Sequence, residues 1–405
     1  MIKTAIIGVS GFGNVHYRDL MNYQGKGLLE ICAATIINQD EEKEKCEKLR
    51  SLGCKIYTDY KQMLADFKGK VEVCFIPTGI HLHKPMTVAA LEAGMNVYVE
   101  KPLAATIQDV IEMKKAQKAS GKFAAVGYQT MYTPEVMKIK TALCSGKLGK
   151  INVIKCYALW PRAEAYYSRN NWAGKLKLKN DWVLDSPYNN ALAHYLNLIC
   201  FLAGKEVAKS AELKSIQAEL YRANKIESAD TACMRIMTKD GLPLYFIVTH
   251  CCEKNVGPQM TIACEKGEIK WEPSKTIMTI SGKTEEIVNQ NQEGLRTCVM
   301  DSILKRVGDK NAFICDLDIA GTQTLAANGV HESSEIHQID EKLIHVLTIK
   351  DAYTQTESKL HVAKGVGEIV KDAYDKEKLF SELGVTWAVK GKVFPLENYT
   401  HFPSK

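Results

Sequence analysis

The sequence predicts an α/β protein that begins with a doubly wound parallel sheet and continues into an α+β domain with an antiparallel sheet. Two observations predict the first sheet. Short apolar runs alternate with helical stretches over the first 125 residues, and the first run ends in a glycine-rich turn. The second sheet is predicted by later apolar runs that are joined by turn signals such as Asp240-Gly241.

The strands of the first sheet are short and apolar. They are expected at Thr4 to Ile7, Ile31 to Ile37, Lys55 to Tyr57, Val71 to Ile76, Asn96 to Val99 and Phe123 to Val126. The intervening helices carry start and stop signals: Pro85 near one start with Gly94 after its end, and Thr106 ahead of a helix that ends by Gly121. Ligands of such sheets bind at the carboxyl ends of the strands.

The turn after the first strand reads Gly8-Val9-Ser10-Gly11-Phe12-Gly13, and a helix is expected to begin near Asn14. Glycines let the backbone turn sharply and approach a pyrophosphate, whose charge is favoured by the N–H groups and dipole of the helix start. Ser10 stands where a strict G-x-G-x-x-G motif has glycine. An ordinary glycine-rich turn is therefore the alternative to a dinucleotide site.

Asn38 follows the second strand, where a dinucleotide-binding unit often has an acid for the adenosine ribose. An amide can bond a hydroxyl and does not repel a 2′-phosphate, but no arginine stands beside Asn38 to attract one. NAD and NADP both stay open, with a slight lean to NAD. The alternative is a strand-ending turn residue.

Three more segments are expected at the same sheet edge: Pro77-Thr78-Gly79-Ile80-His81-Leu82-His83, Glu100-Lys101-Pro102 and Gly127-Tyr128-Gln129. With the glycine turn and the helix end Ala90-Leu91-Glu92-Ala93-Gly94, the chain resembles the glucose-fructose oxidoreductase and inositol dehydrogenase family (Gfo/Idh/MocA). The resemblance covers about the first 150 residues strongly, residues 185 to 204 moderately, and little beyond about residue 330.

The resemblance implies a Rossmann domain at residues 1–125, then a substrate and oligomerisation domain at 126–405 with an open, mainly antiparallel sheet and an extension from about 335. It also implies an NAD(P)-dependent enzyme that acts on sugars, cyclitols or related polyols. Lys101 would lie beside the nicotinamide and the substrate, with Glu100 close to the cofactor. Further cofactor contacts are expected from Pro77, Thr78, His81, His83 and Gln129. Metal binding by His81 and His83 is disfavoured because no carboxylate cluster accompanies them.

A helix is expected to begin around Asn190, in the segment from Asp185 to Leu198, with His194 on its first turns. The family has Asp four residues before the matching histidine and three residues after it, where this chain has Asn190 and Asn197. An amide can orient a histidine but adds no compensating charge, so His194 is expected to be a weaker base. The alternative is that Asn190 caps the helix and His194 is an interior residue. Tyr188, Asn190 and His194 are the candidate substrate contacts here.

When an alcohol carbon gives hydride to a nicotinamide, its hydroxyl proton must leave. His194 is expected to accept this proton, while Lys101 orients the hydroxyl, stabilises negative charge on oxygen and can share the relay. Which of the two is the base stays open. Two other functions also stay open: a glycoside-cleaving enzyme that uses transient oxidation, and a non-catalytic NAD(P)-binding sensor, which Asn190 and Asn197 suggest.

Aromatic and basic residues gather between residues 157 and 182. This cluster could form a polyol pocket, with Arg162 and Trp172 chosen as substrate contacts, or it could be a packed sheet edge. A charged Arg162 or Arg169 would suit a carboxylated or phosphorylated substrate. The cluster comprises Tyr157, Trp160, Arg162, Tyr166, Tyr167, Arg169, Asn170 and Trp172.

Hairpins are expected from three turns, Asp240-Gly241, Lys266-Gly267 and Ser281-Gly282-Lys283. Helices at Arg296 to Val307 and Asp316 to Ser333 would cover one face of the antiparallel sheet. The other face often forms the dimer interface in the family, so a homodimer or homotetramer is expected. The extension predicts a strand at Lys342 to Lys350 and helices at Val362 to Tyr374 and Glu377 to Leu383. It could wrap the substrate pocket or a neighbouring subunit.

Bulk properties agree with a two-domain enzyme of a reducing compartment. The 405 residues are 46% hydrophobic, and the thirteen cysteines form no C-x-x-C pair. No apolar span or secretory leader is seen, so a cytoplasmic location is expected. The net charge of +6 comes from interleaved charges, which disfavours nucleic-acid or membrane partners.

Overall fold

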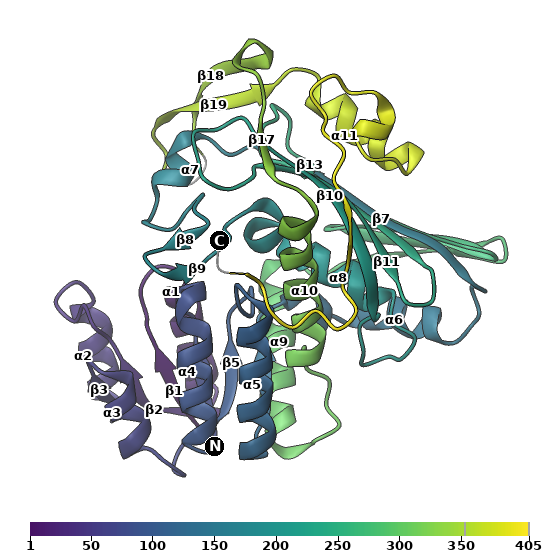
Figure 1. The fold of residues 1–405 in the computed structure, drawn as a ribbon. Coiled ribbons are helices and arrows are strands. Elements are labelled where there is room, and N and C mark those ends of the chain that lie inside the picture. The colour runs from purple at the N-terminus through teal and green to yellow at the C-terminus, as the bar shows by residue number, and fades with distance from the viewer. Residues whose placement is uncertain (352–353, 404–405) are drawn as a thin grey trace. The chain divides into compact units, whose positions relative to one another are not determined.

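The computed structural model describes residues 1–351 and 354–403, and the chain divides into two compact units (Figure 1). Unit 1 contains Met1–Tyr132 and Gln292–Gly321, and unit 2 contains Thr133–Asn291 and the chain from Thr322 onward. Unit 1 thus continues past residue 125 and takes in a distant segment that the sequence analysis placed in the second domain.

Unit 1 is built on a six-stranded parallel sheet in the order β3-β2-β1-β4-β5-β6. The apolar strand residues are almost fully buried, which explains why these short runs carry little polarity. The order reverses between β1 and β4, which is where sheets of this kind bind ligands. The strands are β1 (Ile2–Ile7), β2 (Leu29–Thr35), β3 (Lys55–Tyr57), β4 (Val73–Ile76), β5 (Asn96–Val99) and β6 (Ala124–Val126).

Five helices alternate with these strands: α1 (Gly13–Gly25), α2 (Lys43–Ser51), α3 (Tyr60–Asp66), α4 (Ile80–Glu92) and α5 (Ile107–Ser120). The signals predicted for α5 are confirmed, since Thr106 caps its start and Gly121 ends it at φ 66°. The prediction for Pro85 was wrong. α4 begins at Ile80, directly after the extended Gly79, and Pro85 lies inside the helix on an exposed position.

The first segment of unit 1 ends with the short helix η1 (Gln129–Tyr132), and the later segment of the unit begins with α9 (Gln292–Gly308). α9 packs against α1: Tyr23 Oη donates to Asp301 Oδ1 at 2.7 Å, and Arg296 Nε donates to Asp19 Oδ1 at 3.1 Å. The expectation that this helix covers the second sheet was therefore wrong. The next helix, α10 (Leu317–Ser333), runs across the boundary between the units.

Unit 2 is built on a ten-stranded sheet whose main path is β16-β15-β14-β13-β7-β12-β11-β10-β17, with β20 also paired to β10. Most pairs are antiparallel, and β7–β12 and β10–β17 are parallel. Hairpins form at all three predicted turns. The strands are β7 (Ile151–Leu159), β10 (Leu213–Arg222), β11 (Thr231–Thr238), β12 (Pro243–Thr249), β13 (Val256–Cys264), β14 (Gly267–Glu272), β15 (Lys275–Ile280), β16 (Lys283–Val288), β17 (Ile336–Gln338) and β20 (Val393–Pro395).

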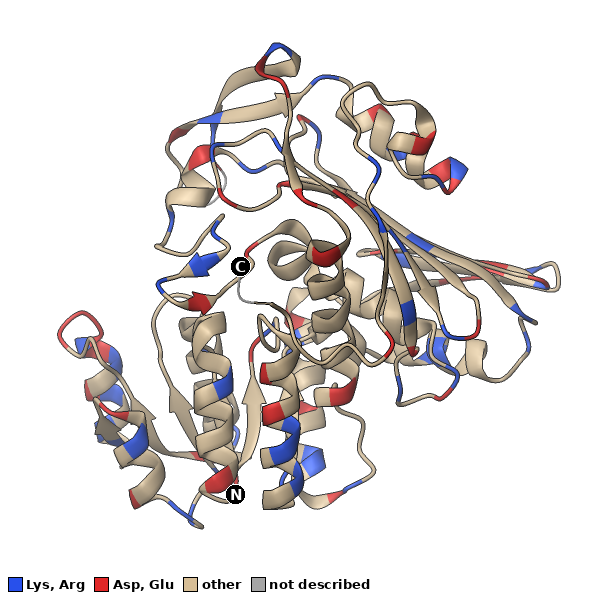
Figure 2. Cartoon of the chain, in the orientation of Figure 1, with Lys and Arg blue, Asp and Glu red and all other residues tan. Residues whose placement is uncertain are grey.

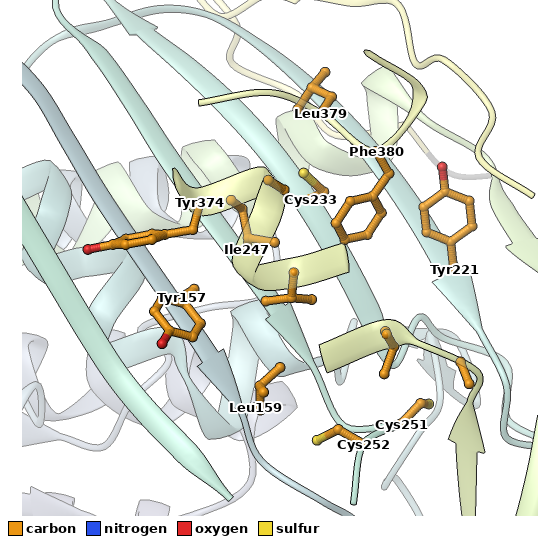
Figure 3. Close-up of a cluster of buried hydrophobic side chains, with 14 of the residues drawn as sticks. Tyr157, Leu159, Tyr221, Cys233, Ile247, Cys251, Cys252, Tyr374, Leu379 and Phe380 are labelled. Carbon is orange, nitrogen blue, oxygen red and sulfur yellow. The ribbon is translucent and has the colours of Figure 1, made fainter. Parts of the chain in front are cut away.

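The C-terminal extension packs on this sheet. Val370, Tyr374 and Phe380 join Tyr157 and Ile247 of the strands in one buried cluster (Figure 3). α8 (Ala193–Leu202) contacts the same strands as α11 (Val366–Lys376), and alternate strand residues face each helix. The expectation of a sheet covered on one face was therefore wrong for its central strands.

The extension also differs from its expected elements. Residues Glu357–Ala363 form strand β19, which pairs with β18 (Ile344–Lys350), so the helix predicted from Val362 begins only at Val366. The helix predicted from Glu377 is reduced to a single turn, η4 (Ser381–Leu383). The other elements of unit 2 are α6 (Pro134–Cys144), α7 (Glu164–Ser168), β8 (Lys177–Leu178), β9 (Asp181–Trp182), η2 (Pro187–Ala191) and η3 (Glu341–Leu343).

Charges of both signs are interspersed along the elements of each unit, as on α2 and α5 (Figure 2). Within residues 1–351 and 354–403, none of the helices has the length and apolar character that a membrane span requires.

Candidate functional site

Five turns of unit 1 meet at the carboxyl edge of its parallel sheet. The glycine turn follows β1, Asn38 lies three residues after β2, and Pro77-Thr78 follows β4. Glu100-Lys101 follows β5, and Gly127 to Gln129 follow β6. Because β1, β4 and β5 are neighbours, three of these turns lie in a row. The structure thus brings together the segments that the sequence analysis expected to hold a cofactor.

The glycine turn leaves no room for side chains at its tightest point. A Cβ on Gly13 would lie 2.7 Å from Gly8 O and 3.5 Å from Pro77 Cγ, and Gly8 has φ +93°. Phe12, the residue before α1, makes no side-chain cap, and the first turn of α1 has no acid. The positive end of α1 is therefore open to an anion such as a diphosphate.

Ser10 and Asn38 join the turn to the end of β2. Asn38 Nδ2 donates to Ser10 Oγ at 3.1 Å and to Glu41 Oε2 at 2.7 Å. Glu42 pairs with Lys45, whose hydrogen bond holds the pKa of this carboxyl below its usual value. Sequence reasoning missed Glu41, Glu42 and Lys45, although three consecutive acids, Asp40 to Glu42, so soon after Asn38 were a visible signal.

Two polar atoms after β4 are buried without a hydrogen-bond partner among the described residues: Thr78 Oγ1 and His81 Nδ1. A bound ligand with hydrogen-bonding groups would satisfy both. His83 does not fit its predicted cofactor contact. It is fully buried, and its two ring nitrogens lie 2.8 Å from Pro102 O and 3.0 Å from Thr78 O, so the ring ties two turns together.

Glu100 is buried and anchored within unit 1. Its Oε1 lies 2.8 Å from His16 Nε2, and its Oε2 accepts from the Lys101 N–H at 3.0 Å. Burial raises the pKa of Glu100, but His16 and then Lys101 more than offset this, so the pKa is lowered. A Cβ on Gly127 would lie 2.8 Å from the same carboxylate. His16 was missed, although its place one turn into α1 points it at the sheet.

Lys101 and Gln129 are half-buried beside these anchors. The backbone that carries them is fixed, because Gly127 N donates to Val99 O at 2.9 Å and Lys101 N is held by Glu100. Both predicted positions therefore lie at the same sheet edge as the glycine turn.

In unit 2, the segment around His194 is held by Asp185. Asp185 Oδ1 accepts from Asn190 Nδ2 at 2.7 Å, and Oδ2 accepts from Gly174 N at 2.6 Å. Ser186, not Asn190, caps the helical segment, and His194 lies half-buried in the first turn of α8. The proposed cap by Asn190 is wrong, and a buried carboxylate lies one hydrogen bond behind this amide.

Tyr188 does not fit its predicted contact with substrate. The side chain is fully buried, and its hydroxyl lies 2.9 Å from His331 Nε2. Its carbonyl oxygen accepts from Gln323 Nε2 at 3.0 Å. Tyr188 therefore packs η2 onto α10, which explains why an aromatic residue stands at this position.

The far end of α8 is held by a buried amine. Lys140 Nζ donates to the carbonyls of Phe201 and Gly204 at 2.5 Å and of Lys209 at 3.0 Å. Burial lowers the pKa of Lys140 to about 8. The carbonyls of Phe201 and Gly204 lie at the negative end of α8, where a cation is favourable.

The aromatic and basic cluster forms mainly around Tyr166. The Arg169 guanidinium carbon lies 3.6 Å from its ring centroid, and that of Arg162 lies 4.9 Å away. Trp160 and Trp172 flank the two arginines at 5.5 and 5.2 Å. Tyr157 does not belong to this cluster, because its ring packs against that of Tyr374 in α11.

Comparisons with known proteins agree with this geometry. The family model "Oxidoreductase family, NAD-binding Rossmann fold" matches residues 2–128, and "GFO/IDH/MocA C-terminal domain" matches residues 136–270. The inositol 2-dehydrogenase/D-chiro-inositol 3-dehydrogenase of Halalkalibacterium halodurans is 27% identical over 38% of this chain and 43% of that protein. Inositol 2-dehydrogenase of Salmonella typhimurium is 29% identical over 37% and 43%. The alignments thus span less than half of these two relatives.

Solved structures share the fold. Levoglucosan dehydrogenase in complex with NADH superposes with a TM-score of 0.69 at 16% identity, covering 82% of this chain and 96% of that one. The WlbA dehydrogenase from Bordetella pertussis in complex with NADH and UDP-GlcNAcA gives 0.66 at 19% identity, covering 82% and 95%. Together with the two family models, these observations show that the chain belongs to the Gfo/Idh/MocA family of oxidoreductases.

Proposed function

We propose that the protein is an NAD(P)-dependent oxidoreductase that transfers hydride between a nicotinamide cofactor and a CH–OH group of a sugar, cyclitol or related polyol. One observation carries this proposal: three adjacent strands are followed by the glycine turn, by Thr78 and His81, and by Glu100-Lys101. The buried Thr78 and His81 atoms have no hydrogen-bond partner in the part of the chain that the structure describes. The inositol dehydrogenases among the relatives support the substrate class.

The residues of unit 1 fit a dinucleotide. The Gly8 to Gly13 turn would receive the diphosphate, and Asn38 a ribose hydroxyl. Thr78 and His81 offer hydrogen-bonding atoms at the middle of the sheet edge. The nicotinamide would supply the acceptor for hydride, and the protein would supply position and proton transfer.

We favour NAD over NADP. Glu41 bonds the same amide that would meet the ribose, and Glu42 adds a second carboxylate near Ser10. A 2′-phosphate would meet like charges there, which disfavours its binding. Lys45 is already paired with Glu42 at 2.6 Å.

Lys101 and His194 are the proposed catalytic residues. Lys101 would orient the substrate hydroxyl and stabilise negative charge on its oxygen, while His194 would take the hydroxyl proton. Asp185 would hold Asn190 in place through their hydrogen bond. Its carboxylate would also provide some of the negative charge that an aspartate at position 190 would place near His194. Asn190, Arg162 and Trp172 stay candidate substrate contacts.

The test is NADH formation across a panel of polyols, including inositols and levoglucosan, with Lys101→Ala and His194→Ala variants. Each substitution is expected to lower kcat about 10²- to 10⁴-fold. Lys115→Ala, an exposed lysine of α5, is the matched control and should retain full turnover. NADH binding should persist in all three variants, which a fluorescence titration checks.

Full turnover by Lys101→Ala would contradict the proposal. NADH binding without turnover of any polyol would instead support a sensor. Release of aglycone from a chromogenic glycoside with no net NADH would support the glycoside-cleaving alternative.

We also propose that the protein forms a homodimer or homotetramer through the sheet of unit 2. α11 covers the central strands, so this interface would use β14 to β16, where Lys270 pairs with Glu268 and Lys275 with Glu286. Light scattering gives the oligomeric state, and a monomer at micromolar concentration would contradict this assignment. All thirteen cysteines are free thiols, which supports a reducing compartment such as the cytoplasm.

A further inference from the structure

Two arginines of unit 2 share one aromatic ring. Arg169 and Arg162 both stack on Tyr166, at 3.6 and 4.9 Å from the ring centroid. Each also donates to a nearby backbone carbonyl, Arg169 to Tyr166 O and Arg162 to Pro161 O. These contacts hold two positive charges close together, although like charges repel.

The charge of Arg169 is not balanced by an acid. Within residues 1–351 and 354–403, no carboxylate lies within 4.0 Å of its guanidinium. Glu164, on the neighbouring helix α7, is bonded to His361 at 2.8 Å. Asp185 accepts hydrogen bonds from Asn190 and Gly174.

A histidine lies beside the same ring, since the ring centroids of His250 and Tyr166 are 6.1 Å apart. His250 is buried and bonds Trp160 O through Nδ1 at 2.7 Å. Its pKa is lowered well below the usual value, first by burial and then by the charges of Arg162 and Arg169. A neutral imidazole therefore stands beside the arginines and does not add to their charge.

A series of contacts connects the segment that carries the two arginines with the His194 segment of the same unit. Asn170 Oδ1 accepts from the N–H groups of Trp172 and Ala173, which fixes the loop after Arg169. Gly174, at the end of that loop, donates to Asp185, the residue that holds Asn190 one turn before His194. On the other side, Trp160 packs against Tyr195 with centroids 6.0 Å apart.

The C-terminal extension braces this segment. Ser358 Oγ of β19 accepts from Ala165 N at 2.9 Å, and His361 of β19 bonds Glu164. Ala163 packs in a small apolar cluster with Leu360 and Val362. The helix between the two arginines is therefore fixed before any ligand binds, and such preorganisation favours affinity.

We propose that the substrate carries an anionic group, a carboxylate or a phosphate, that Arg162 and Arg169 bind. A guanidinium presents planar paired donors that match both groups. This inference rests on the proposed function and narrows its substrate class to charged sugars or polyols. Trp160 and Trp172 would pack on the carbon skeleton beside the charge.

The test compares a neutral hexose, its uronate and its 6-phosphate. Binding to the NADH-loaded protein is followed by tryptophan fluorescence, and turnover by NADH formation from the NAD-loaded protein. The wild type should bind one anionic compound about ten- to a hundredfold tighter than the neutral hexose. Preference for the uronate or for the 6-phosphate identifies which anion the site takes.

Arg169→Gln should abolish most of this preference, and Arg169→Lys should retain part of it. Arg306→Gln is the control, because Arg306 lies in unit 1 and donates to Ala312 O at 2.7 Å. Equal binding of all three compounds by the wild type, or an unchanged preference in Arg169→Gln, would overturn the inference.

The two proposals can fail separately. Turnover of neutral polyols without charge preference would leave the oxidoreductase standing and remove the anion site. An anion preference in binding that Arg169→Gln abolishes, without any turnover, would support the site and count against the enzyme.

Discussion

The two units fix their candidate site residues in different ways. In unit 1, the glycine turn, Thr78 and Lys101 are placed by strand ends, and their spacing along the chain already predicts a shared edge. In unit 2, Asn190 lies in the short helix η2 and Arg169 directly follows α7. Residues far along the chain hold both helices: Gln323 bonds Tyr188 of η2, and Ser358 and His361 bond residues of α7. The candidate cofactor contacts thus depend mainly on local sequence, and the candidate substrate contacts depend also on long-range packing.

The difference has a functional logic. NAD and NADP present the same diphosphate and nicotinamide groups whatever the substrate, so regular strand ends suffice to position those contacts. Substrates differ, and loops on a rigid scaffold can change with them. The extension of this chain, through β18 and β19, adds a support for one such loop that the sequence pattern did not reveal.

The largest effect is expected at Lys140, the buried amine at the end of α8 in unit 2, and it concerns the free energy of unfolding. Its pKa is about 8 when folded and near 10.5 when unfolded, so the unfolded state binds more protons between these values. Stability should therefore rise with pH in this window. Relative to Lys140→Met, the wild type should gain about 3 kcal/mol between pH 8 and 10.5.

Urea denaturation of both proteins across this pH range measures the gain. The difference between them is used because buried tyrosines and cysteines affect both alike. Lys138→Met is the control, because Lys138 lies on the same helix but is half-exposed and pairs with Glu285. A flat difference between wild type and Lys140→Met would show that the amine does not titrate there.

The next effect tests the turn of unit 1. Gly13→Ala would place a methyl group 2.7 Å from Gly8 O, so the turn must shift and NADH affinity should fall about a hundredfold. Gly25→Ala is the matched control in the same helix, since a Cβ there meets nothing within 4 Å. Titration of NADH fluorescence measures both. Equal affinities would mean that the turn does not bind the diphosphate.

Much of unit 1 could be predicted from sequence, because a parallel strand, its turn and its helix are contiguous. His16 was missed because its partner Glu100 lies 84 residues away and meets it only in the folded sheet. Glu41 was missed although its partner Asn38 is three residues away. In unit 2 the hairpins were predicted from their turns. The cover of α11, the place of α9 and the role of Tyr188 were not, because each depends on contacts between segments more than 100 residues apart.

A smaller effect is expected at Asp185, which accepts a hydrogen bond from Asn190 in the His194 segment. Asp185→Asn keeps the shape and removes the charge, so kcat should fall about tenfold. The apparent pKa of the base in the pH profile of kcat/KM should also fall, because a protonated histidine loses a favourable charge. Asp181→Asn, an exposed acid on β9, is the control. A lower kcat with an unmoved pH profile would assign Asp185 a purely structural role.

The smallest effect concerns the choice of cofactor at the end of β2. Glu41 is exposed, so its repulsion of a 2′-phosphate is screened and amounts to about 1 kcal/mol. Glu41→Gln should therefore narrow the preference for NADH over NADPH about fivefold. Glu44→Gln, an exposed acid on α2, should leave the preference unchanged. Binding titrations with both cofactors measure the ratio. If the wild type prefers NADPH and Lys45→Gln removes that preference, then Lys45 and not Glu41 determines the cofactor preference. Local sequence would then not predict, even in unit 1, a contact in which a side chain and not the backbone selects between NAD and NADP.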